Sequence, residues 1–125
     1  MKKLSLLFLL LISFNSYGEW VKVHKNTSGD ASYIGMDTIK ERGEYVYWQR
    51  LTNYLEPNEY GDMSSNIHYQ GDCGEKRFKY LSFTFYKQPM GRGNKEKGFN
   101  APGWNSPTLK SVDSILLNYA CNYVK

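Results

Sequence analysis

The C-terminal segment, residues 108–123, is the feature that most constrains the fold of this chain. Apolar residues recur in it at steps of three, one and four, the spacing that lines one face of an α-helix. They are Leu109, Val112, Ile115, Leu116, Tyr119 and Ala120. The opposite, polar face consists of Lys110, Ser111, Asp113, Ser114, Asn118 and Asn122. A lone helix of this length is only marginally stable in water, so the segment requires a partner surface for its apolar stripe.

The start of this helix is predicted from a local signal. Ser106 followed by Pro107 indicates an N-cap and a first helical residue. Proline suits that position because it lacks the amide hydrogen that the first turn would leave unpaired. The predicted helix therefore has Ser106 as its N-cap and begins at Pro107.

Runs of β-branched and aromatic residues predict the strands that cover the helix. They span residues 20–25, 31–35, 44–53, 63–70 and 77–87. In the last run, alternation predicts Leu81, Phe83 and Phe85 as core residues. Short links without intervening helices favour antiparallel pairing. The predicted fold class is α+β, with an antiparallel sheet of about five to six strands and the C-terminal α-helix packed on one face and tethered by a disulfide.

Two other segments are predicted to lie outside the strands. Residues 36–40 indicate a single helical turn with Asp37 as its cap. Residues 88–105 hold four glycines and two prolines, which predict a long irregular loop. Loops of this length are more often functional or mobile than merely connecting, so this segment is a candidate binding element.

The first eighteen residues predict a signal peptide. Lys2 and Lys3 precede a short apolar run, and small residues end at Gly18, the predicted cleavage point. Cleavage leaves one domain, residues 19–125, in which Lys and Arg fall from 16 to 14 against 12 Asp and Glu. This small excess of basic over acidic residues does not indicate a nucleic-acid partner. No later stretch is apolar enough to span a membrane.

The two cysteines, Cys73 and Cys121, both lie in the predicted exported domain, where an oxidising compartment favours a disulfide. An intramolecular bridge has only one possible connectivity and closes a loop of 49 residues, counting both ends. On the chain-entropy model, the bridge restricts the unfolded chain and thereby stabilises the folded protein by roughly 4 kcal/mol. A metal pair or an intermolecular bridge is the weaker alternative, because neither cysteine has a second one at CxxC spacing.

The reactive side chains of this sequence predict no catalytic residues, no metal site and no cofactor. A nucleophilic triad needs a histidine, and His24 and His68 each lie in a predicted strand among polar neighbours. Acidic residues in the stretch 55–62 are typical of a solvated loop. Gly91 and Gly93 precede neither a helix nor the Lys-Ser or Lys-Thr pair that a phosphate-binding loop requires. We therefore expect a protein that is not an enzyme.

Charge segregation is the most specific remaining signal. Residues 55–75 contain five acids and no base, whereas residues 76–97 contain seven bases and one acid. These stretches can pair with each other, or the basic one can dock an anionic polymer or an acidic protein patch. Tyrosines of the predicted sheet offer a second recognition surface. The candidate partner-binding residues are Arg92, Lys95, Lys97, Tyr45, Tyr47 and Tyr80.

The order of landmarks along the chain resembles the surface-adhesin protein E family of bacterial exported proteins. These landmarks are Trp20, Tyr33, Ile34, Asp37, Thr38, Ile39, Val46, Trp48, Asn53, Tyr54, Tyr69, Asp72, Cys73, Tyr86, Met90, Gly91, Trp104, Leu116 and Cys121. The resemblance implies an antiparallel sheet with a C-terminal helix tied by a disulfide across one face. It also implies a homodimeric adhesin that binds host proteins of the vitronectin, laminin and plasminogen class.

The chain departs from the family's name-giving adhesin in its predicted signal peptide. That adhesin is a lipoprotein, whereas residues 1–18 contain no cysteine to be lipidated. We therefore expect a periplasmic or secreted location, with cell-surface display requiring another route. Two functions stay open: a non-catalytic adhesin-type binding module, and a periplasmic accessory or enzyme-inhibitor protein with a bacterial or intruding-enzyme partner.

Overall fold

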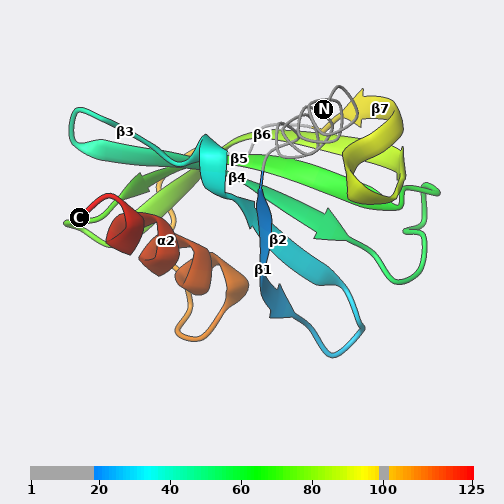
Figure 1. The fold of residues 1–125 in the computed structure, drawn as a ribbon, viewed down its shortest axis with the longest axis horizontal. Helices are drawn as coiled ribbons and strands as arrows, with labels where there is room; N and C mark the ends of the chain where they lie inside the picture. Colours follow the sequence, from blue (N-terminus) through cyan, green and yellow to red (C-terminus); the bar gives the residue numbers. More distant parts are fainter. Residues whose placement is uncertain (1–18, 99–101) are drawn as a thin grey trace, which may run out of the picture.

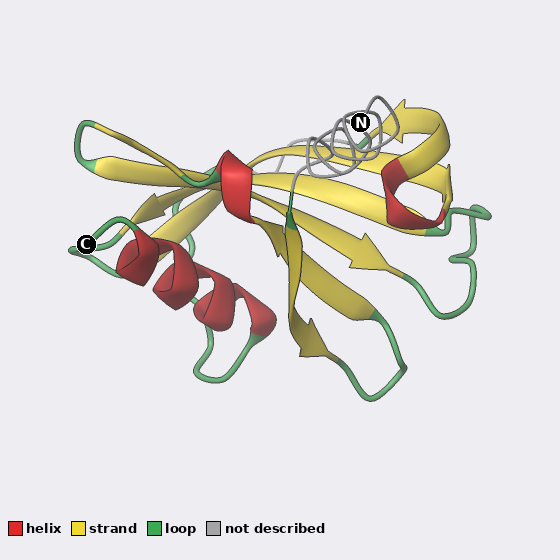
Figure 2. Cartoon of the chain, viewed as in Figure 1, coloured by secondary structure: helices red, strands yellow, loops and turns green. Residues whose placement is uncertain are grey.

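The structure, a computed structural model, describes residues 19–98 and 102–125. The predicted signal peptide lies outside the described residues. Within them, an antiparallel sheet is covered on one face by the helix α2 (Figures 1 and 2). This arrangement confirms the predicted α+β fold.

The described part of the sheet has seven strands, of which six form a continuous order β1-β2-β4-β5-β6-β7. Their bounds are β1 Trp20–Lys25, β2 Ala31–Gly35, β3 Lys40–Arg42, β4 Tyr45–Asn53, β5 Ser64–Asp72, β6 Arg77–Gln88 and β7 Arg92–Lys97. All pairings are antiparallel, as predicted. The short β3 pairs with the first half of β4, whereas β2 pairs with its second half.

The central strand β4 is apolar on both faces, as its sequence predicts. Val46 and Trp48 are buried on the face that meets α2. Leu51 is buried on the opposite face, beside Gly91 of the 3-10 turn η2, Pro89–Gly91. Burial on both faces explains why β-branched and aromatic residues dominate this strand.

The helix α2 spans Val112–Tyr123, so the predicted start at Ser106 and Pro107 is wrong. Lys110 has a φ of 68°, which places it outside helical geometry, and the helix begins five residues later than predicted, at Val112 instead of Pro107. Ser111 is the actual N-cap, because its hydroxyl accepts a hydrogen bond from the amide of Ser114 at 3.2 Å. Leu109, predicted in the apolar stripe, precedes the helix and is 83% exposed.

The core lies between α2 and the sheet. Leu116, Leu117 and Ala120 of the helix are buried against a layer of strand residues. That layer comprises Ile34, Ile39, Val46, Trp48, Ile67, Tyr69 and Phe78. Gly71 lets the helix approach closely, because a Cβ there would lie 2.5 Å from Trp48 Cζ3 and 2.9 Å from Leu117 Cδ1.

A disulfide joins Cys73, just after β5, to Cys121 in the second half of α2. This pairing confirms the prediction of an intramolecular bridge. It links two positions 48 residues apart in sequence and holds the C-terminal half of the helix against the sheet. The alternatives of a metal pair and an intermolecular bridge are excluded in this structure.

The core prediction for β6 is wrong at Leu81, which is 41% exposed. The pairing with β5 shifts between His68 and Tyr69, so that Leu81 is an extra residue in the ladder. Phe78 and Tyr80, before this bulge, therefore share the helix-facing side with Phe83, after it. Strict alternation cannot locate such a shift.

The predicted loop at residues 88–105 is only partly a loop. Its first part is the turn η2 followed by the strand β7, which pairs with the end of β6. Positive φ angles at Met90 and Gly91 reverse the direction of the chain between these strands. Asn53 Oδ1 accepts a hydrogen bond from the Met90 backbone amide at 2.7 Å. Gly91 and Gly93 therefore belong to a hairpin.

The turn predicted at residues 36–40 exists as the 3-10 helix η1, Met36–Thr38, but Asp37 does not cap it. Thr38 holds this turn instead. Its hydroxyl donates to the Gly35 carbonyl at 2.6 Å and accepts from the Gln49 amide at 3.0 Å. The chain then continues directly into β3, a strand that the sequence pattern did not predict.

Candidate partner-binding surface

The strand β7 forms one edge of the described sheet. All six of its residues are exposed, and within the described residues it pairs only with β6. Lys95 lies opposite Tyr86, and Lys97 lies opposite Thr84. Directly paired residues share one face of a sheet, so both lysines lie on the face away from α2. Glu96 lies on the other face, so the only acid of β7 is directed away from its two lysines.

The predicted basic residues Arg92, Lys95 and Lys97 are therefore brought together, although not in a loop. A strand holds their backbones at a fixed spacing of about 3.4 Å per residue. Exposed lysines are also common on edge strands because they discourage pairing with other chains. The charges of β7 are consequently accessible to a partner while its backbone is protected from aggregation.

Two of the three predicted tyrosines lie together on the face away from α2. Tyr45 and Tyr47 are both half-buried and are separated by one residue of β4. The Tyr45 ring centroid is 5.4 Å from that of Trp104. The Tyr47 hydroxyl accepts a hydrogen bond from Gln70 Nε2 at 3.3 Å. These contacts orient both rings.

Tyr80 lies apart from the other two tyrosines, on the helix-facing side of the sheet. Its hydroxyl donates to Asp113 Oδ2 at 2.7 Å. The Tyr69 hydroxyl donates to Asp113 Oδ1, also at 2.7 Å, and accepts from Arg50 Nη1 at 3.0 Å. The bulge at Leu81 produces this placement by fixing which side of β6 meets the helix.

The prediction of Asp113 on the polar face of the helix is wrong. Its side chain is only 18% exposed and lies 3.6 Å from Arg50 Nη1. With Leu116, Leu117 and Ala120 it completes a pattern of steps three, one and three, which places it on the buried stripe. That periodicity was the available signal.

The Asp113 cluster is a structural element that joins the start of α2 to the sheet. Burial raises the pKa of Tyr69 and of Tyr80, and the neighbouring Asp113 carboxylate acts in the same direction. Both phenols therefore stay protonated as hydrogen-bond donors. Neither of the two surface hollows described below is lined by Asp113.

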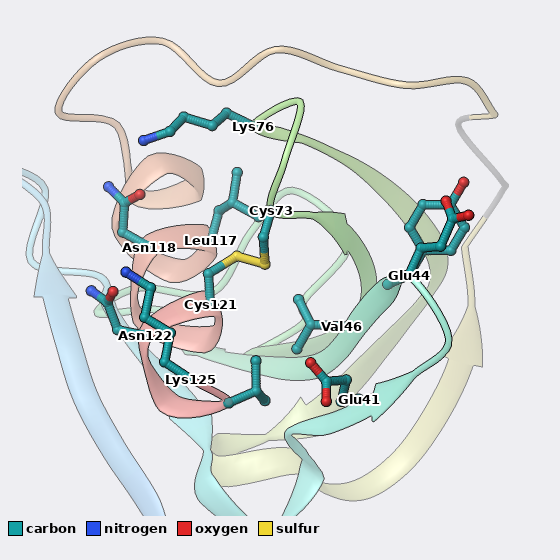
Figure 3. Close-up of a pocket in the computed structure, with 12 residues that line it drawn as sticks. Glu41, Glu44, Val46, Cys73, Lys76, Leu117, Asn118, Cys121, Asn122 and Lys125 are labelled. Atoms are coloured by element: carbon teal, nitrogen blue, oxygen red, sulfur yellow. A yellow bond between two sulfur atoms is a disulfide. The ribbon is translucent and has the colours of Figure 1, made fainter.

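The first hollow, of about 310 Å³, lies beside the disulfide, between the β3–β4 hairpin and the C-terminal half of α2 (Figure 3). Its charged lining residues are Glu41, Glu44, Lys76 and Lys125. The second hollow, of about 350 Å³, includes residues of η1, β3, β4 and β5 together with Leu81. Its polar lining includes Lys40, Arg42, Tyr47, Gln49 and His68.

The described residues contain no cluster suited to metal binding. No three His, Cys, Asp or Glu side chains within them are placed to hold a metal ion. His24 lies on β1 and His68 on β5, two strands that are not neighbours in the sheet. Partial burial lowers the pKa of His68. In the same ranges, no helix is long and apolar enough to cross a membrane.

The fold and this surface define a small disulfide-bonded α+β domain that presents a basic edge and an aromatic sheet face. The chain belongs to the surface-adhesin protein E family, whose model matches residues 20–122. The disulfide and the family together fit an extracytoplasmic location. No curated protein matches the chain.

Solved structures with the same fold include those of Haemophilus influenzae protein E. Crystal form II of that protein has a TM-score of 0.67 and 18% identity, over 85% of this chain and 90% of the other. A second protein E structure has a TM-score of 0.65 and 17% identity, over 83% of this chain and 85% of the other. Protein E from non-typeable Haemophilus influenzae has a TM-score of 0.60 and 15% identity, over 84% of this chain and 77% of the other. These likenesses establish the shared fold.

Proposed function

We propose that this protein is an exported, non-catalytic adhesin-type binding protein whose partner is a protein that docks on β7. Membership of the surface-adhesin protein E family supports the class of function. The observation that carries the docking site is the exposure of every residue of β7. A basic edge strand attracts an acidic patch on a partner and leaves room for it to approach.

The proposed partners are host matrix or serum glycoproteins of the vitronectin, laminin and plasminogen class. The signal peptide of residues 1–18 directs export in this proposal and is removed, leaving residues 19–125. Tyr45 and Tyr47 provide a second contact region for a large partner, because they lie on the same side of the sheet as Lys95 and Lys97. A homodimer, implied by the family resemblance, would double the number of basic edges and raise avidity.

A second candidate function is a periplasmic accessory or enzyme-inhibitor protein. It is favoured by one observation, the lack of a cysteine in residues 1–18 that could be lipidated for anchoring. In that case the same basic edge would contact a bacterial protein or an intruding enzyme. The two candidates differ in where the protein is found, and not in which residues it uses.

Reversing the charges of β7 with Arg92→Glu, Lys95→Glu and Lys97→Glu is expected to weaken binding to the partner by about tenfold or more. The melting temperature should change little, because exposed charges contribute little to stability. Binding of immobilised vitronectin, laminin and plasminogen would be measured by surface plasmon resonance at low and high salt. Attraction through exposed charges should fade with salt, since the Debye length is about 8 Å at physiological ionic strength.

A matched control reverses three exposed lysines away from β7, namely Lys22, Lys25 and Lys110. It changes the net charge by the same amount as the β7 variant. Equal binding by the wild type and the β7 variant would refute the assignment of β7. Equal weakening by both triple variants would show that only net charge matters, which also contradicts a site on β7.

A further inference from the structure

A row of paired residues crosses four strands on the sheet face away from α2. Lys40 of β3 pairs with Tyr47 of β4, Tyr47 with Gln70 of β5, and Gln70 with Lys79 of β6. Neighbouring strands lie about 4.8 Å apart, so the backbones at the two ends of this row are separated by roughly 14 Å. The row therefore places a tyrosine and an amide between two lysines.

Trp104 packs over the β6 end of this face. Its ring centroid lies 4.4 Å from the Arg77 guanidinium carbon and 4.6 Å from Lys79 Nζ. Asp72 accepts a hydrogen bond from Arg77 Nε at 3.0 Å. The charges at this end thus have partners within the protein. Trp104 forms an aromatic boundary for the remaining face.

The β3 end of the same face has accessible positive charge. Lys40 and Arg42 are exposed, and neither forms an ion pair within the described ranges. The Arg42 guanidinium carbon lies 6.0 Å from the centroid of the Tyr47 ring. Both bases line the second hollow, and Asp37 is its only carboxylate among the described residues. An anion that enters the hollow therefore meets an excess of positive charge.

The floor of the hollow offers hydrogen-bond donors beside an aromatic ring. Gln49 Oε1 accepts a hydrogen bond from Asn66 Nδ2 at 3.1 Å, which fixes the orientation of the Gln49 amide. Its NH₂ group forms no hydrogen bond within the described residues and is left for a ligand. His68 and Leu81 line the hollow with it, the first as a polar group and the second as an exposed apolar one.

We propose that this hollow and the adjoining Tyr47 ring form a binding site for an acidic oligosaccharide. Sugar rings combine apolar C–H faces with hydroxyl groups, which match Tyr47 and the free amide of Gln49. Carboxylate or sulfate groups on the same sugars match Lys40 and Arg42. A simple inorganic anion lacks the apolar face, and a neutral glycan lacks the charge. The hollow, at about 350 Å³, accommodates only a short stretch of such a chain.

This site is separate from the one proposed on β7, and the two can be tested independently. The probe is a size-defined heparin hexasaccharide, with its affinity measured by isothermal titration calorimetry. The double variant Lys40→Glu and Arg42→Glu is expected to weaken binding at least about tenfold, because both cations are reversed. The charge-matched double variant Lys22→Glu and Lys25→Glu, at two exposed positions of β1, is expected to change binding less than about twofold.

Substitutions of Tyr47 separate ring packing from charge. Tyr47→Ala removes the ring and should weaken binding about tenfold, whereas Tyr47→Phe should stay within about twofold of the wild type. The hydroxyl is expendable because it already accepts a hydrogen bond from Gln70. Thermal melts identify any variant that fails to fold. If Tyr47→Ala does not fold, the comparison of the two charge-reversed variants still decides the proposal.

Three outcomes would overturn the proposal. The first is no binding of the hexasaccharide by the wild type. The second is equal weakening by the two double variants, which would indicate diffuse attraction to a cationic surface. The third is equally tight binding of a single-stranded thymidine hexanucleotide with the same dependence on Lys40, Arg42 and Tyr47, which would identify a general polyanion site.

Discussion

Leu116→Asp is expected to unfold the domain or to lower its free energy of unfolding by about 4 kcal/mol or more. The Leu116 side chain is 0% exposed and packs in the layer between α2 and the sheet. An aspartate there would bury a charge without a partner and would leave a cavity where the leucine had packed. Circular dichroism during thermal and urea denaturation measures the loss.

Asn118→Asp is the matched control for this substitution. It introduces the same side chain on the same helix, two residues away, at an exposed position. Its effect on the melting temperature should be small, as for other surface substitutions. Coincident melting curves for the two variants would show that α2 does not pack on the sheet as described.

Removing the disulfide with Cys73→Ser and Cys121→Ser is expected to lower the free energy of unfolding by about 3–4 kcal/mol. The bridge closes a long loop, because its ends lie 48 residues apart, and it also anchors the second half of α2. The spectrum of the folded sheet should be retained at urea concentrations below the new unfolding transition, because both serines replace cysteines that lie outside the strands. Urea titrations of the wild type, each single variant and the double variant measure the change.

Reduction of the wild-type protein provides a control for the cysteine substitutions. Dithiothreitol should lower the free energy of unfolding of the wild type to a value close to that of the double serine variant. It should leave the free energy of unfolding of that variant unchanged. Mass spectrometry under non-reducing conditions, on protein isolated from the cell envelope, should find no free thiol. Two free thiols in that sample, or a wild-type stability unchanged by reduction, would contradict the role of the bridge.

Much of the fold could be predicted because local patterns agree with the tertiary structure. The runs that became β1, β2, β4 and most of β5 and β6 have apolar residues where the core requires them. The cysteine pairing followed from a count of two. The helix was located correctly but its start was not, because the left-handed conformation of Lys110 is not a preference of lysine.

The errors in the candidate site have a common cause in strand register. Tyr80 and Phe83 share the side that faces α2 only because Leu81 is an extra residue between them, and a single inserted residue reverses the alternation of faces along a strand. The strand β7 is polar throughout and contains a glycine, so alternation could not reveal it. Asp113 is different, because its spacing from Leu116 and Leu117 predicts an inward side chain.

The sheet face proposed to bind an acidic oligosaccharide had no signal in the sequence. Lys40, Tyr47, Gln70 and Lys79 come from four strands, and only the register of three pairings places them in one row. The shared face of Tyr45 and Tyr47 is predictable from the sequence, because both lie on a single strand with a period of two. Residues on one element are predictable in this way, whereas residues on several elements require the structure.

The central claim, that this chain is an adhesin-type binding protein, is tested most directly by its accessibility on intact cells. An antibody raised against the folded domain would be applied to intact and to permeabilised cells that produce the wild type or the β7 triple variant. Equal labelling of intact and permeabilised cells is expected for both proteins, with capture of vitronectin, laminin or plasminogen by the wild-type cells only. Labelling that appears only after permeabilisation would contradict this claim and would favour the periplasmic accessory or inhibitor function.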